Sequence, residues 1–191
     1  DLTLSLDHAD LSLLPVFSEQ VEWALGRTEG RLKLSGTRAA PRLTGTLNVR
    51  GGAVKLRFFE HPLTDMEIAV DALGDSVSVR TCTGHMGTGT YQLTGRMGLA
   101  GGRPTAYDFT FVMDALAVKT SFFDGPLSGT LHLTEGEYWG EKLPQVSGTI
   151  NMDRALVTIP SIPETDDALP HIILDVGLMV DRHVHFFSPN L

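Results

Sequence analysis

In residues 41–49 the sequence reads PRLTGTLNV, and this stretch decides the fold. Its apolar side chains, Leu43, Leu47 and Val49, alternate with polar ones, and Gly45 occupies an apolar position. Because successive side chains of a β-strand point to opposite faces of a sheet, the alternation predicts a strand with one apolar and one wetted face. The glycine predicts a bend, since curved sheets use glycine kinks.

The same two-residue period runs through most of the chain, in roughly a dozen runs bounded by Gly, Pro, Asn or Asp. Strands with one apolar face suit an antiparallel sheet better than a parallel one. We expect one apolar face, lined by Leu32, Leu34, Leu47, Val49, Val54, Leu56, Met66, Ile68, Val70, Leu93, Met97, Phe109, Phe111, Leu131, Leu133, Ile150, Met152, Val157 and Leu174.

Residues 144–152 read PQVSGTINM and match residues 41–49 position by position, glycine included. Repeated strand units are typical of arrays in which neighbouring units stack and bury a shared apolar face. We therefore expect one segment, residues 1–191, with repeat-like units over residues 28–100 and 126–187. Glycines at apolar positions are expected to bend the sheet on its concave side: Gly45, Gly95, Gly129 and Gly148.

Residues 15–25 break the two-residue period. Their apolar residues Phe17, Val21, Ala24 and Leu25 are spaced as on one face of an α-helix. Pro15 suits a first helical turn and Gly26 a helix end, so we expect a short helix over residues 15–25. A flexible connector is expected over residues 160–170, PSIPETDDALP.

One short helix cannot cover the apolar side of a dozen strands. That side must close on itself, pack against a second sheet or hold something apolar. The sequence thus predicts an all-β fold, a long, curved, mostly antiparallel sheet folded into a U-shaped apolar groove. Its aliphatic lining suits an acyl chain and an ordinary sandwich core equally well, and the sequence leaves both open.

The composition excludes several classes of partner. The formal net charge of −8 argues against nucleic acid and against an anionic membrane face as the main partner. The chain has one cysteine, Cys82, and no run of 18 apolar residues. It begins at Asp1 in mid-pattern, and we interpret it as a piece of a longer protein.

No constellation in the sequence predicts catalysis. Gly74-Asp75-Ser76 is similar to an esterase nucleophile motif, but a turn between two strands explains it, since no helix is expected to follow. Asp181, His183 and His185 have a spacing that can hold zinc on one strand face, yet no further strong ligand is evident. We expect no enzymatic activity, no cofactor and no metal.

The order of the motifs resembles a known family. Residues 29–54, EGRLKLSGTRAAPRLTGTLNVRGGAV, look like the repeated element of TamB, and residues 127–157 resemble a weaker copy. The resemblance implies a periplasmic β-groove segment of an inner-membrane-anchored protein of a Gram-negative bacterium. It also implies a TamA-like outer-membrane barrel protein as partner.

The resemblance further implies a function without catalysis, in which phospholipid or another acyl lipid moves along the groove toward the outer membrane. Two alternatives stay open. The first is a chaperone-like module that templates strands of nascent outer-membrane proteins, because open sheet edges invite strand pairing. The second is a structural β-solenoid spacer with a filled core.

Overall fold

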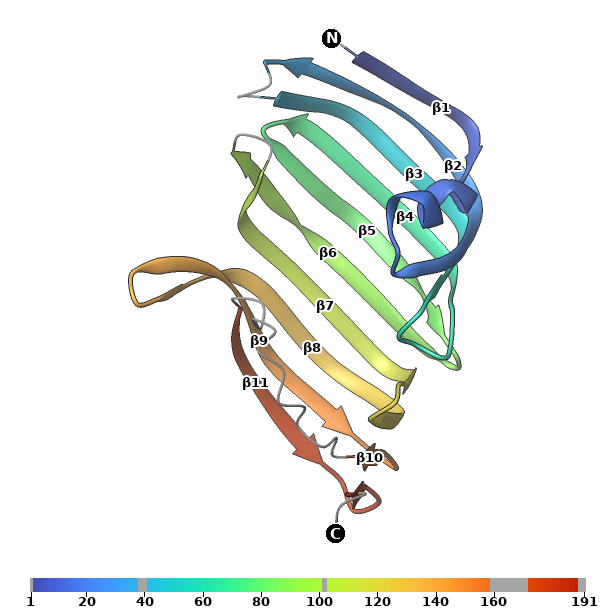
Figure 1. Ribbon diagram of the computed structural model, residues 1–191, viewed down its shortest axis with the longest axis vertical. Coiled ribbons are helices and arrows are strands. Elements are labelled where there is room, and N and C mark those ends of the chain that lie inside the picture. Colours follow the sequence, from blue (N-terminus) through green and yellow to red (C-terminus); the bar gives the residue numbers. More distant parts are fainter. Residues whose placement is uncertain (1, 38–40, 101–102, 159–171, 189–191) are drawn as a thin grey trace.

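A computed structural model of the protein describes residues 2–37, 41–100, 103–158 and 172–188. These residues form one open, 12-stranded sheet with very little helix (Figure 1). The strands are β1 (Leu2–Asp10), β2 (Val21–Gly36), β3 (Pro41–Leu56), β4 (Leu63–Gly74), β5 (Ser76–Met86), β6 (Gly89–Ala100), β7 (Arg103–Lys119), β8 (Phe123–Tyr138), β9 (Glu141–Met152), β10 (Leu156–Thr158), β11 (Ile173–Val180) and β12 (His185–Phe187).

The strands follow one another across the sheet in chain order from β1 to β8. Beyond β8 the sheet divides, because β9 pairs with most of β8 while β10 pairs with its first residues. All pairs are antiparallel except β9 with β11 and β10 with β12. The long strands curve along their length, as Figure 1 shows. The predicted fold class is therefore confirmed.

The buried core occupies only one end of the strands. Its members lie near the ends joined by residues 57–62, 87–88 and 120–122, and we call this part the packed half. The residues of this buried cluster are Ala24, Val54, Met66, Met86, Tyr91, Met113, Leu116, Val118, Phe123, Met152 and Ala155. At the opposite end of the strands, which we call the open half, the large apolar side chains are half-buried or exposed, and the small Ala72 is buried opposite Gly45.

The predicted helix over residues 15–25 is wrong in extent. The α-helix α1 covers only Leu14–Phe17, after a 3₁₀ turn η1 at Leu11–Leu13, and β2 begins at Val21. A β-bulge between Val21 and Trp23 sets Val21 and Ala24 on the same sheet face, three residues apart. The bulge thus produced the helix-like spacing from a strand.

The predicted bend glycines lie where only glycine fits. Gly45 and its repeat counterpart Gly148 have φ of 132° and 135°, and a Cβ on either would overlap a backbone oxygen of the neighbouring strand. Gly95 and Gly129 share both properties. Gly26, which was expected to end a helix, is another glycine of this kind. Its φ is 139°, and a Cβ there would lie 2.7 Å from the Gly52 Cα.

Two predictions concern other segments. The turn at Gly74-Asp75-Ser76 is confirmed, since β4 ends at Gly74 and β5 begins at Ser76. The connector predicted over residues 160–170 lies outside the described residues. The division into repeat-like units stays a prediction.

Candidate functional site

Strand register gathers the predicted groove residues on one face of the sheet. Directly opposed residues share a face, and Leu47 opposes Val70, which opposes Val79. Beyond that, Leu93 opposes Phe111 and Phe111 opposes Leu131. Followed in this way, the register puts every one of the predicted lining residues, from Leu32 to Leu174, on the same face.

These residues differ in how far they are covered. In the packed half Val54, Met66 and Met152 are buried, and Val49, outside that cluster, is buried as well. In the open half the side chains are half-buried, and Leu34 and, on the outer strand β11, Leu174 are 43% and 70% exposed. An apolar face of this length that stays accessible to solvent is unusual in a soluble domain.

The open half contains an apolar cavity of about 350 Å³. Almost no polar surface lines it. Its size falls in the range of roughly 300–1,000 Å³ that small-molecule sites occupy. The apolar side chains around it come from β6, β7, β8 and β9, and they are Leu93, Phe109, Phe111, Leu131, Leu133 and Val146.

Within the part of the chain that the structure describes, two buried hydroxyls on the apolar face have no hydrogen-bond partner. They belong to Thr28 on β2 and Tyr91 on β6. Burial raises the pKa of the Tyr91 hydroxyl, and the nearby Cys82 thiol raises it further. Burial also raises the pKa of Cys82, which keeps the thiol protonated and a poor nucleophile.

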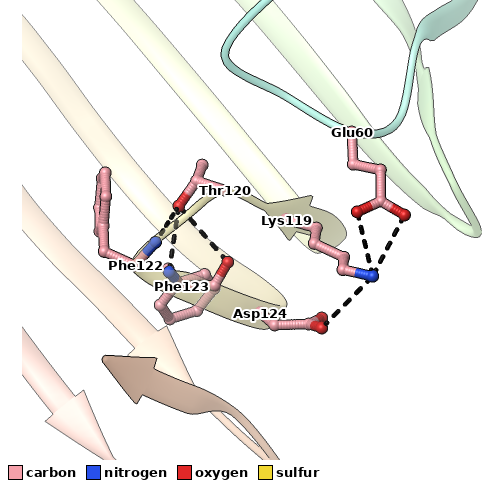
Figure 2. A network of polar contacts seen from close by, with 6 residues as sticks. All are labelled: Glu60, Lys119, Thr120, Phe122, Phe123 and Asp124. Carbon is pink, nitrogen blue, oxygen red and sulfur yellow. Dashed lines mark hydrogen bonds and ion pairs between the residues drawn. The ribbon is translucent and has the colours of Figure 1, made fainter. Parts of the chain in front are cut away.

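Residues 57–62 form a strap over the end of the packed half. Arg57 donates from its Nε to the carbonyl oxygen of Glu19 at 2.7 Å, and the Glu60 amide donates to the carbonyl oxygen of Lys119 at 2.9 Å. The Lys119 ammonium lies 3.0 Å from a Glu60 carboxylate oxygen and 3.8 Å from Asp124 (Figure 2). The hydrogen bond from Lys119 to Glu60 raises the pKa of Lys119 above its usual value.

The β7–β8 turn next to the strap is held by the Thr120 side chain and by a backbone hydrogen bond from the Thr120 amide to the Phe123 carbonyl oxygen at 2.7 Å. The Thr120 hydroxyl accepts hydrogen bonds from the Phe122 and Phe123 amides at 3.3 and 3.0 Å, as Figure 2 shows. The Phe123 ring is buried in the core, and Phe59 of the strap packs against that core. The strap thus joins β3 to β4 along the chain, contacts the end of β7 through Lys119 and packs on the core of the packed half through Phe59.

A larger cavity of about 750 Å³ lies at the strap end of the sheet and is lined by polar as well as apolar groups. His61, Asp124, His183 and His185 contribute to it, whereas Asp181 lines a neighbouring cavity. The expectation that Asp181, His183 and His185 share one strand is wrong, because β11 ends at Val180 and β12 begins at His185. Among the described residues, no three His, Cys, Asp or Glu side chains are placed to hold a metal ion.

Most of the core residues of the packed half were not predicted from the sequence. Leu116 and Val118 lie on the apolar face although their phase is opposite to that of Phe109 and Phe111. The reversal occurs at Ala115, which has a φ of 47° within a register shift between Met113 and Leu116. One inserted residue exchanges the two faces of a strand. The change of phase between Met113 and Leu116 was the only sequence signal of this bulge.

No family model, curated protein or solved structure matches this chain. Within the described residues, no helix is long and apolar enough to cross a membrane. The resemblance to the TamB family therefore stays a prediction that rests on the quoted motifs.

Proposed function

We propose that the chain is an acyl-lipid-carrying groove module, in which the apolar sheet face holds hydrocarbon and the wetted face meets water. The observation that carries the proposal is the apolar face itself, which runs without interruption from β2 to β11 and stays open in one half. The cavity of about 350 Å³ lies within that half.

The physical basis is the cost of exposing hydrocarbon to water. Each CH₂ group removed from water contributes about 0.8 kcal/mol. A lipid whose chain lies along the apolar face while its headgroup remains in water can move from strand to strand without exposing the whole chain. The aliphatic and phenylalanine side chains around the cavity leave almost no polar surface there that would hold the chain at one position.

The wider role follows from the family resemblance and is part of the same proposal. The module would belong to a TamB-like periplasmic protein that carries phospholipid between the two membranes and meets a TamA-like barrel protein. Groove transport of this kind requires no catalysis and no cofactor.

The test is native mass spectrometry of the purified chain, followed by binding of a fluorescent phospholipid. Leu93→Glu introduces a carboxylate into the apolar cavity, and Gln92→Glu adds the same charge to the exposed face one residue away. We expect the Leu93→Glu variant to lose bound phospholipid and the Gln92→Glu variant to keep it. A wild-type chain that carries no lipid and binds none would overturn the proposal.

A second candidate, the templating of strands from nascent outer-membrane proteins, is favoured by β11. Among the described residues this strand pairs only with β9, and Leu174, Leu178, Met179 and Val180 are at least half exposed. An edge strand with exposed apolar side chains can accept another strand. Photo-crosslinkers placed at Met179 should capture unfolded barrel protein, and capture of lipid alone would exclude this role.

A further inference from the structure

The turn between β8 and β9 exposes two aromatic rings. The strands remain paired up to Tyr138 and Glu141, and Trp139 and Gly140 form the turn. Trp139 is 89% exposed and Tyr138 58% exposed, and their ring centres lie 6.0 Å apart. In Figure 1 this hairpin projects beyond the neighbouring strands. We call these two residues the aromatic tip.

The backbone of the turn makes the choice of tryptophan unusual. Trp139 and Gly140 have φ of 54° and 80°, so both central residues of the two-residue turn are left-handed. Asn, Asp and Gly are favoured at the first position of such a turn, and a bulky side chain there is strained. The Trp139 ring lies next to that of Tyr138 and is 89% exposed, so burial within the described residues does little to offset this strain. A partner outside the chain that buries the ring would offset the strain.

The charges around the aromatic tip indicate the kind of partner. The Lys142 ammonium pairs with Glu135 at 2.5 Å and also lies opposite Glu137 across the hairpin. One positive charge thus meets the three carboxylates of Glu135, Glu137 and Glu141, and the charge beside the rings stays net negative. An anionic surface would be repelled. A surface that presents ammonium groups outermost would be attracted by the carboxylates and by the faces of the rings.

Tryptophan and tyrosine are enriched where membranes meet water, because each ring combines an apolar body with a polar hydrogen-bonding atom. A zwitterionic lipid surface carries its ammonium groups outside the apolar interior. We propose that the aromatic tip docks onto a zwitterionic lipid surface, with Trp139 and Tyr138 inserted and Glu137 and Glu141 facing the ammonium groups.

The aromatic tip and the apolar cavity lie on the same hairpin. Leu133 on β8 and Val146 on β9 line the cavity. Tyr138 follows Leu133 by five residues, which is about 17 Å along an extended strand. Docking would bring the open half close to a lipid surface, but it does not depend on the groove carrying lipid.

The test uses vesicles and the fluorescence of the tip itself. Trp23 and Trp139 are the two tryptophans, so Trp23→Phe leaves Trp139 as the only reporter. With phosphatidylcholine vesicles we expect a blue shift of Trp139 emission and co-sedimentation of the protein. Vesicles of equal parts phosphatidylcholine and phosphatidylglycerol should bind more weakly at low salt. An unchanged emission spectrum in the presence of phosphatidylcholine vesicles would overturn the proposal.

Trp139→Asn separates docking from folding, because asparagine suits the left-handed turn position. We expect this variant to be at least as stable as the wild type and to bind phosphatidylcholine vesicles at least about tenfold more weakly, since one buried aromatic ring is removed. Trp23→Phe should bind as the wild type does. Binding by Trp139→Asn equal to that of the wild type would contradict the proposal.

Two further variants make the test specific. The double change Glu137→Lys and Glu141→Lys should transfer the preference from zwitterionic to anionic vesicles, and an unchanged preference would exclude the charge argument.

Leu93→Glu should dock normally while losing lipid from the groove, and Trp139→Asn should keep groove lipid while losing docking. The failure of either proposal is thus visible without the other.

Discussion

The packed and open halves share one apolar face and one set of strands, yet only the packed half has a buried core. In the packed half, bulges at positions such as Ala115 redirect the strands, and η1, α1 and the strap cover them. In the open half the glycines Gly45, Gly95 and Gly148 interleave with half-buried aliphatic side chains. The comparison teaches that alternation alone makes an apolar face, and that covering segments decide where it becomes a core.

The largest expected effect concerns the glycines. Gly45→Val or Gly148→Val adds a β-branched side chain at a left-handed φ and into the backbone of the neighbouring strand. We expect a loss of at least about 4 kcal/mol of unfolding free energy, because neither strand can move without breaking its pairing. Urea unfolding measures this change in unfolding free energy. Gly177→Ala, where the nearest atom would lie 3.7 Å from the new Cβ, is the control and should change little.

Cavity-forming substitutions compare the two halves directly. Met86→Ala in the packed half should lose about 3 kcal/mol, since Met86 is 1% exposed and its removal leaves a void. Leu34→Ala in the open half should lose less than about 1 kcal/mol, because Leu34 is 43% exposed. Equal losses in chemical denaturation would mean that the open half is packed in solution.

Tyr91→Phe removes a buried hydroxyl that has no hydrogen-bond partner among the described residues. We expect a gain of about 1 kcal/mol in unfolding free energy, because an unsatisfied buried donor is destabilising. The thermal midpoint should rise. A fall would show that the hydroxyl binds a group within the groove.

The smallest effect is expected at the strap. Lys119→Met removes the ion pairs to Glu60 and Asp124, and hydrogen exchange should accelerate in residues 57–62 while the open half exchanges as before. The pKa of Lys119 is raised in the folded state, so its contribution is present below the ordinary lysine pKa and is lost as pH rises through the raised value. Exchange protection of the strap that is unchanged in the variant would mean that its other contacts, among them the Glu60–Lys119 backbone bond and the Arg57–Glu19 bond, are sufficient to hold it.

The sequence anticipated the open half better than the packed half, and particular residues explain why. Leu93, Phe111 and Leu131 continue their strand patterns without interruption, so their face could be predicted. Leu116 and Val118 follow a bulge, and Val21 and Ala24 span one, so a fixed period assigned them to the wrong face or to a helix. The aromatic tip gave no signal at all, because one Trp-Gly pair in a sequence does not show that its ring is exposed.

The sequence by itself determined the class of the fold, the apolar face and the glycine positions, because a period of two and a missing Cβ are local properties of the chain. Only the tertiary structure decided which half of that face is covered, which hydroxyls are left without partners and where Trp139 projects. These depend on bulges, strand lengths and the contacts of distant segments such as Glu60 with Lys119. No local pattern encodes such contacts, since they arise from residues far apart in the chain.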